Sequence, residues 1–278
     1  MKTFRKTSNW FWGLIALAVA ALIFVVPFAF IFLTASKTSQ EAIALKFSLP
    51  QEWNIWPNLV AVFEANDYMI VRAFGNSIML TVLSVAILVF LAAMTAWIID
   101  RRPGKIAKFA NFLVLSGLII PPAIVPTIFL LQSLGIYGTF PSMVLIEVAF
   151  GTSFTVMIFK AFISTIPREL DEAAILDGAN SVQLFFRIVF PLLRSVIVTA
   201  VILNSVFVFN DFTNPLYFMS GPGSETVQLT LFNFKSQYLT DYNLLFMDIL
   251  IITIPMVVLF AIFNNRIVAG MTAGAVKG

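Results

Sequence analysis

The side chains of this 278-residue chain allow only a narrow range of chemistry, because the sequence contains no cysteine and no histidine. The groups that most often act as nucleophiles, general bases and transition-metal ligands are therefore missing. No glycine-rich phosphate loop of the GxxxxGK[ST] type occurs either, which argues against ATP binding by that route. We expect no catalytic residue, no metal and no cofactor, and any ATP-driven work would have to come from a partner.

The first group of candidate residues lies in a polar segment at residues 164–194. This segment carries four of the 14 acids, namely Glu169, Asp171, Glu172 and Asp177. Pro167 precedes them and suits a first helical turn, where negative charge complements the helix dipole. Gly178 is well placed to end that helix, and Ser181 can cap a second one. The segment is therefore predicted to form a short helix, a tight turn and a second helix.

The same segment contains a patch of small residues, which allows two interpretations. The patch consists of Ala173, Ala174, Gly178 and Ala179. Small side chains let another backbone approach closely, and a helix that faces only water has no need of them. This favours a docking element for another protein. The alternative is a helix pair that lies on the bilayer surface and merely joins two membrane spans.

The second group of candidates lies within apolar stretches and includes the acids Glu147, Asp211 and Asp248. Ionisable groups inside a membrane are expensive and usually functional, although solvation at the interface is the alternative for Glu147 and Asp248. Positions 204, 211 and 215 would share one face of a continuous helix. We therefore expect Asn204, Asn210 and Asp211 to line a translocation path or its gate.

The elements that position these groups follow from composition, since 60% of residues are hydrophobic and only 11% are charged. A soluble domain carries roughly 25% charged residues, so the sequence predicts an all-α polytopic membrane protein. A spanning helix needs roughly 20 apolar residues. Six stretches of about that length occur, at 9–36, 73–99, 109–133, 142–159, 195–218 and 244–265. Pro121, Pro122 and Pro126 should break or kink the third.

The basic residues orient these six helices, because lysine and arginine concentrate in cytoplasmic loops. With both termini inside, thirteen of the 17 basic residues lie on the cytoplasmic side, and only Lys37, Lys46, Arg72 and Lys235 lie outside. The polar segment 164–194 then faces the cytoplasm, and the three intramembrane acids lie in the outer third of the bilayer. The net charge of +3 is too small to indicate nucleic-acid binding.

The polar segment resembles a known motif. Glu172-Ala-Ala, Gly178, Ile188 and Pro191 are similar to the EAA loop of permease subunits in binding-protein-dependent ABC importers, with Phe190 where the family usually has Leu. The resemblance implies a MetI-like ABC permease fold, with residues 1–278 as one transmembrane permease domain. It comprises a first helix at 1–36 and a five-helix core at 73–265. The loop at 164–194 would form coupling helices that insert into a groove on the ATPase subunit.

Other segments resemble carbohydrate-uptake permeases in particular. The first is Phe209-Asn-Asp-Phe, in which Phe209 replaces the family's Trp. The second is the external stretch from Thr226 to Leu245. The third is the tail from Ala269, which is similar to the end of the maltose-type second permease subunit. The resemblance implies a sugar substrate and three kinds of partner: an extracytoplasmic solute-binding protein, a second permease subunit in a heterodimer, and an ATP-binding subunit dimer. It also implies that the chain lies in the lipid of a bacterial inner membrane. Alternatives are a permease for a polyol, glycerol phosphate or amino acid, and a stand-alone secondary transporter or channel.

Overall fold

The computed structural model describes all residues except 1–3, 103, 220, 222, 235–240 and 276–278. Some residues used in the predictions above therefore lie outside the described residues, namely Lys2, Lys235 and the last three residues of the tail, which include Lys277. All regular secondary structure in the described part of the chain is helical. Its five longest helices are α1 (Phe4–Ala35), α4 (Met69–Arg101), α7 (Phe140–Ile163), α11 (Arg194–Asn210) and α13 (Tyr242–Ala275).

Shorter helices connect these long ones. They are α2 (Ser39–Ala42), α3 (Ile55–Glu64), α5 (Lys105–Ile119), α6 (Ile124–Ser133), α8 (Glu169–Leu176), α9 (Ser181–Leu184), α10 (Phe190–Leu192) and α12 (Thr213–Phe218). A π-helical turn, η1 (Phe185–Val189), joins α9 to α10, and a 3-10 helix, η2 (Thr230–Phe234), precedes α13.

Four helices in the described part of the chain are long and apolar enough to cross a membrane, at Trp12–Ala35, Met69–Arg101, Phe140–Ile163 and Tyr242–Phe263. A fifth span results if Ser181–Leu192 and Arg194–Asn210, bent by 75°, count as one. These segments overlap five of the six predicted stretches, but the helix within the fifth ends at Asn210 rather than at residue 218. The number of six helices and their orientation remain predictions.

The third predicted stretch is broken at its prolines, as expected. Helix α5 ends at Ile119, and Ile120 is extended with ψ 121°. A residue before proline is disfavoured in the helical region because its backbone clashes with the proline ring. Helix α6 begins at Ile124 and accommodates Pro126 in its first turn.

The chain forms two compact units, and the first comprises Met1–Val71 and Thr230–Pro255. Inside it, the buried Asn58 side chain donates to the carbonyls of Ala35 and Lys37, both at 2.8 Å, and accepts from Asn243 at 2.9 Å. The Lys37 ammonium is 1% exposed and donates to the Lys46 carbonyl at 2.7 Å. These bonds tie the segment after α1 to α3 and to the start of α13.

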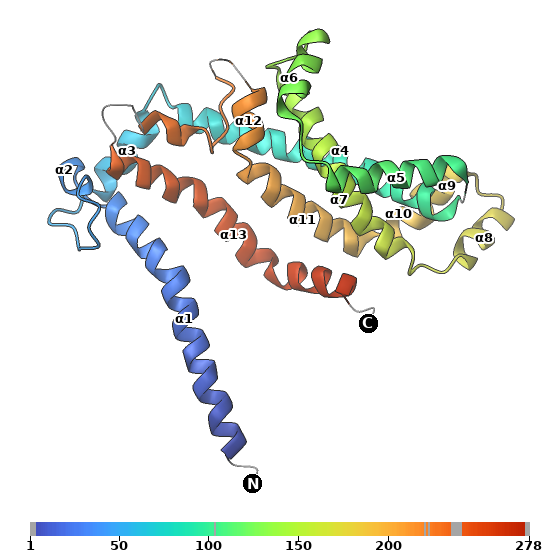
Figure 1. Ribbon diagram of the computed structural model, residues 1–278, viewed down its shortest axis with the longest axis horizontal. Helices are drawn as coiled ribbons and strands as arrows, with labels where there is room; N and C mark the ends of the chain where they lie inside the picture. Colours follow the sequence, from blue (N-terminus) through green and yellow to red (C-terminus); the bar gives the residue numbers. More distant parts are fainter. Residues whose placement is uncertain (1–3, 103, 220, 222, 235–240, 276–278) are drawn as a thin grey trace. The chain divides into compact units, whose positions relative to one another are not determined.

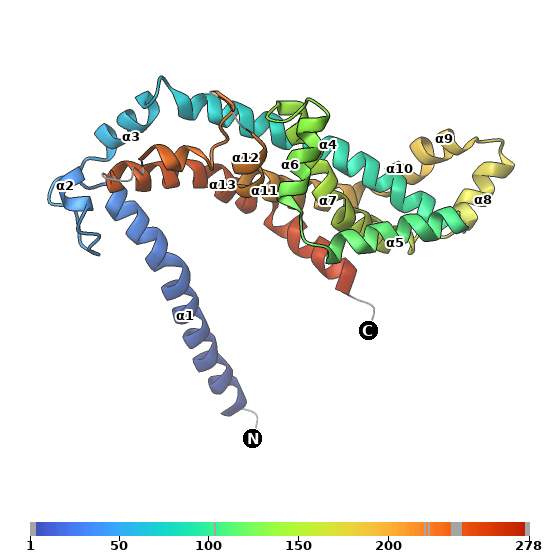
Figure 2. The ribbon, with the colours of Figure 1, turned by 45° about the horizontal axis from the view of Figure 1, so that its top comes forward.

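The second unit comprises Arg72–Leu229 and Met256–Gly278. Here α5, α11 and α12 pack against α7 (Figure 1), and small residues on α4, including Ala92, Ala93 and Ala96, are fully buried in the apolar core. Figure 2 shows α8 and α9 at the end of this unit where α4 ends and α5 begins. The polar segment singled out by the sequence thus lies at one end of a packed helix bundle.

Candidate functional site

Helix α8 begins and ends where its residue types favour it. Glu169, Asp171 and Glu172 lie in its first turn, where the free N–H groups stabilise negative charge. At its end the Gly178 N–H donates to the Ile175 carbonyl, and the Ala179 N–H donates to the Ala174 carbonyl at 2.9 Å. This double pattern is a Schellman motif. It requires the left-handed φ of +85° that Gly178 adopts, so the predicted role of Gly178 is confirmed.

The second helix starts differently from the prediction. Asn180, not Ser181, caps α9: its side chain accepts from the Gln183 N–H at 2.9 Å, and the Gln183 side chain accepts from the Asn180 N–H at 3.0 Å. This reciprocal pair is a capping box. The expectation that Ser181 is the cap is wrong, because the asparagine side chain before it already satisfies the helix N–H groups.

The eight residues predicted to contact a partner divide into two faces of α8. Glu169, Glu172 and Ala173 share the exposed face, and Asp177 and Gly178 continue it. Asp171 and Ala174, three residues apart, are buried on the other side, and Ala179 is half-buried. Only part of the predicted set is thus available to a partner. The buried part holds α8 on the rest of the unit.

Sequence reasoning missed the exposed apolar residues of α8. Leu176 is 87% exposed, and Leu170 and Ile175 are also exposed. Leu176 lies three and four residues after Ala173 and Glu172, so it shares their exposed side of the helix. The available signal was three aliphatic residues interspersed with three acids in a helix of only eight residues.

Beside this helix lies a hollow of about 380 Å³. It is lined by residues of the turn and of the following helices, namely Asp177, Gly178, Ala179, Gln183, Arg187 and Ile188. We define these hollow-lining residues and the exposed face of α8 as the α8–α9 surface. It combines acidic, basic and apolar groups within one short stretch of chain.

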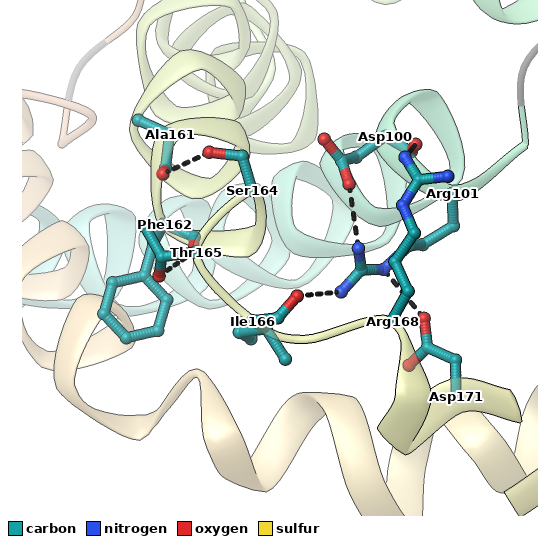
Figure 3. Close-up of polar contacts among 9 residues, drawn as sticks. All are labelled: Asp100, Arg101, Ala161, Phe162, Ser164, Thr165, Ile166, Arg168 and Asp171. Carbon is teal, nitrogen blue, oxygen red and sulfur yellow. Dashed lines mark hydrogen bonds and ion pairs between the residues drawn. The ribbon is translucent and has the colours of Figure 1, made fainter. Parts of the chain in front are cut away.

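The last turn of α4 anchors this surface from behind (Figure 3). The Arg101 Nε forms an ion pair with the Asp171 carboxylate at 2.7 Å, and Nη2 of the same guanidinium donates a hydrogen bond to the Ile166 carbonyl at 2.8 Å. Both charged side chains are nearly buried, with 9% and 12% of their surface exposed. Arg101 was counted among the orienting charges, but its partner was not foreseen.

Aromatic side chains support the second helix of the segment. Phe185 is buried and packs against Trp97 of α4, with ring centroids 5.4 Å apart, and against Phe90 at 6.4 Å. Phe190 lies 5.6 Å from Phe185. The segment therefore rests on α4 through apolar as well as ionic contacts.

The residues predicted to line a path lie at two different places in the second unit. Asn204 is 4% exposed in the middle of α11, where its amide donates to the Ala200 carbonyl at 2.8 Å. The Thr155 hydroxyl of α7 lies 3.2 Å from its carbonyl oxygen. Asn204 thus links α11 to α7. Asn210 is exposed at the end of α11 and accepts from the Gln228 side chain at 3.3 Å.

Asp211 lies outside the helix, so the expected common face of positions 204, 211 and 215 is wrong. Helix α11 ends at Asn210, and Asp211 is extended with ψ 124°. Its carboxylate accepts from the N–H groups of Thr213 at 2.9 Å and Asn214 at 3.3 Å. Asp211 competes for backbone N–H groups in this way, which ends one helix and starts the next.

The other two acids that were predicted to lie in the membrane are buried within the protein. Asp248 is fully buried and accepts from the Thr230 hydroxyl at 2.8 Å. Glu147 is buried in α7, with 7% of its surface exposed. Protein groups thus surround the acids for which interfacial solvation was the alternative.

Comparison with known proteins identifies the family. A family profile described as "Binding-protein-dependent transport system inner membrane component" matches residues 69–273. The chain is 31% identical over 281 residues to the melibiose/raffinose/stachyose import permease protein MelC of Bacillus subtilis (strain 168), covering 100% of both chains. It is 32% identical over 210 residues to the trehalose transport system permease protein SugB of Mycobacterium tuberculosis (strain CDC 1551 / Oshkosh), covering 74% of this chain and 77% of the relative.

A solved structure shares the fold. It is the crystal structure of a bacterial ABC transporter involved in the import of the acidic polysaccharide alginate, with a TM-score of 0.80 at 15% identity. The match covers 95% of this chain and 98% of that one. The chain therefore belongs to the family of binding-protein-dependent transport system inner membrane components. It is a non-catalytic, multi-pass permease subunit of an ABC importer with the MetI-like fold.

Proposed function

We propose that this permease forms half of the translocation pathway for a sugar or oligosaccharide, which a binding protein outside the membrane delivers. Two relatives that are 31% and 32% identical carry names of di- and oligosaccharide importers, which supports the substrate class. A second permease subunit completes the pathway as a heterodimer. An ATPase dimer supplies the energy, since this chain carries no phosphate loop of its own.

The α8–α9 surface is the proposed contact with the ATPase. The observation that carries this proposal is the exposed face of α8, where Glu172 and Ala173 lie beside Leu176. A helix resting on the inner leaflet would bring its acids to a membrane surface that is itself negative, which is unfavourable. A partner protein that offers basic groups and an apolar groove suits this face better than lipid does.

Six crossings with both termini in the cytoplasm are the proposed topology, with α5 and α6 together forming the third. The positive-inside rule supports this orientation. The chain has no cysteine, so single cysteines at the exposed Glu172 and Glu52 test it directly. We expect an impermeant thiol reagent to label Glu52→Cys in intact cells and Glu172→Cys only in inside-out vesicles from which the ATPase has been removed.

Asn204, Asn210 and Asp211 are proposed to belong to the path or its outer gate. The polar side chains of Asn204 and Asn210 on α11 and of Asp211 directly after it support the proposal. We expect an Asn204→Ala, Asp211→Ala double variant to assemble with its partners but to transport substrate at a reduced rate. Full transport by the assembled variant would contradict a role in the path.

Glu172→Lys tests the docking surface. We expect at least a tenfold loss of uptake in reconstituted vesicles, because a positive charge replaces a negative one at the ATPase contact. Membrane insertion should stay normal. Glu52→Lys makes the same charge change at an exposed position of the first unit and should transport normally. Unchanged uptake and unchanged co-purification of the ATPase with Glu172→Lys would show that α8 does not dock.

The substrate is tested on the partner receptor. The binding protein that co-purifies with the assembled importer should carry a di- or oligosaccharide, identified by mass spectrometry. Its affinity for maltose-type and melibiose-type sugars should exceed its affinity for polyols, glycerol phosphate and amino acids. Preference for one of these other solutes would overturn the sugar assignment and leave the permease assignment intact.

A further inference from the structure

The cytoplasmic end of α4 is bonded to the α8–α9 segment at points far apart along that segment. Arg101 reaches the Ile166 carbonyl before α8 and the Asp171 carboxylate within it. Arg102 donates to the Ser181 hydroxyl at 2.7 Å, at the first residue of α9. Arg168 returns a bond to the Asp100 carbonyl at 3.1 Å. Contacts before, within and after α8 therefore fix its position and its direction.

Arg101 is the centre of this arrangement (Figure 3). Its guanidinium lies between the Asp171 carboxylate at 2.7 Å and the Ile166 carbonyl at 2.8 Å, with the Asp100 carboxylate at 3.3 Å. A guanidinium is planar and presents several N–H groups in a fixed fork. It can therefore hold two separate segments in one geometry, which a single-point contact cannot do.

The charges at this joint are well shielded from water. The side chains of Arg101, Asp171 and Asp100 are 9%, 12% and 14% exposed. Pulling α8 away from α4 would leave a carboxylate and a guanidinium unpaired in a poorly hydrated place, which is strongly unfavourable. Separation of the two elements is therefore costly, and joint movement avoids that cost.

Helix α4 runs from this joint through the core of the second unit. Its buried residues Leu88, Ala92 and Ala96 lie along one side of the helix, and Phe185 of the π-helical turn packs on Trp97. A displacement of α8 that is passed to Arg101 therefore reaches the packed core through a continuous helix of 33 residues.

We propose that Arg101 is a positioning residue that fastens the α8–α9 segment to α4, so that both move as one body when the ATPase moves the segment. This inference rests on the proposed docking of the α8–α9 surface. Arg101 acts through Asp171 and Ile166. Helix α4 is thereby the route by which nucleotide-driven movement enters the helix bundle.

The test measures sugar uptake per ATP hydrolysed in the reconstituted importer, together with the amount of ATPase that co-purifies. For Arg101→Ala we expect normal co-purification, continued ATP hydrolysis and a fall of about tenfold in uptake per ATP, since movement of the segment no longer carries α4. Lys105→Ala removes the same charge from an exposed position four residues away. That control should match the wild-type chain.

A charge exchange tests whether the pair itself matters. Arg101→Asp combined with Asp171→Arg should recover at least half of the lost uptake per ATP, whereas Asp171→Arg alone should resemble Arg101→Ala. Unchanged uptake per ATP in Arg101→Ala would overturn the proposal. Loss of ATPase co-purification in Arg101→Ala would overturn it too, because Arg101 would then only shape the docking surface.

Failure of the docking proposal is recognised separately. Glu172→Lys lies on the exposed face and leaves the Arg101 joint in place, so normal uptake and co-purification in that variant refute docking alone. A coupling defect in Arg101→Ala beside a silent Glu172→Lys would move the ATPase contact elsewhere and keep the role of Arg101. Wild-type coupling in Arg101→Ala beside a defective Glu172→Lys refutes the role of Arg101 alone.

Discussion

Each unit of this permease contains a joint at which a buried basic side chain bonds to other residues, but the two joints are built from different acceptors. In the first unit, Lys37 is 1% exposed and donates to the Lys46 carbonyl at 2.7 Å and the Ser48 hydroxyl at 3.1 Å. In the second unit, Arg101 pairs with the Asp171 carboxylate. Lys37 closes a loop of its own segment, whereas Arg101 bonds to residues 65 or more positions away in sequence.

The difference indicates what each joint is for. The acceptors of Lys37 are neutral oxygens of residues only nine and eleven positions away, so its hydrogen bonds connect parts of one local segment. That joint therefore stabilises the shape of the first unit. Distant partners around Arg101 join elements that could otherwise move independently. We therefore expect damage at Lys37 to appear as lost stability and damage at Arg101 to appear as lost coupling. The four changes below test this contrast, beginning with the largest expected effect.

Lys37→Met should lower the free energy of unfolding by about 3 kcal/mol, because the two hydrogen bonds of the buried Lys37 to the Lys46 carbonyl and the Ser48 hydroxyl, both made by a charged donor, are lost. The methionine fills a similar volume, so the lost hydrogen bonds dominate. Thermal unfolding in detergent measures the effect. Lys46→Ala is the control, since its main-chain carbonyl remains available to Lys37. Uptake per ATP by the folded fraction should stay normal, and a coupling defect there would end the contrast between the two joints.

Asn180→Ala should destabilise the α8–α9 segment by about 1 kcal/mol, the usual cost of removing a helix cap. The reason is loss of the capping box with Gln183. Hydrogen exchange of residues 169–190 should accelerate while exchange in α7 stays unchanged. Ser181→Ala is the companion variant at the neighbouring position, and equal acceleration in both variants would show that Asn180 has no special role as the cap.

Arg101→Lys should lower uptake per ATP by about threefold, less than Arg101→Ala, because an ammonium keeps the charge but loses the planar fork. One of the two bonds, to Asp171 or to Ile166, would then be lost. Unfolding temperature should change little. An uptake ratio equal to that of the wild-type chain would mean that charge alone positions α8, without the fork geometry.

Ser181→Ala should have the smallest effect, below about 0.5 kcal/mol, as is usual for exposed side chains. It removes the acceptor of the exposed Arg102 bond and leaves the Arg101 joint untouched. Hydrogen exchange at α9 and uptake per ATP are both suitable measurements. A coupling loss as large as that of Arg101→Ala would place the main connection at α9 rather than at α8.

Much of the fold could be predicted from the sequence because its strongest signals are local. Long apolar runs predicted the spans, and the prolines after Ile120 predicted the break in the third. Gly178 was recognised as a helix terminator because the left-handed conformation there favours glycine. The same local reasoning assigned the cap of the next helix to Ser181, whereas the structure shows that the Asn180 side chain accepts the bond.

The errors and omissions concern contacts that periodicity cannot report. The predicted fifth stretch continues past Asn210 to residue 218, but the Asp211 carboxylate accepts from the next N–H groups, and the helix ends at Asn210. The Arg101–Asp171 pair joins residues 70 positions apart, so no local pattern contains it. In the sequence, Arg101 is one positive charge among several that orient the membrane helices.

The 75° bend between Ser181–Leu192 and Arg194–Asn210 has a mechanical consequence. Because the axes of these two segments are nearly perpendicular, a force along the axis of Ser181–Leu192 acts mostly at right angles to the axis of Arg194–Asn210. Helix α11 would then tilt about a point along its length rather than slide like a piston through the bilayer. Tilting opens one end of a helix bundle as it closes the other, and it keeps the apolar girdle of the helix at a constant depth in the lipid.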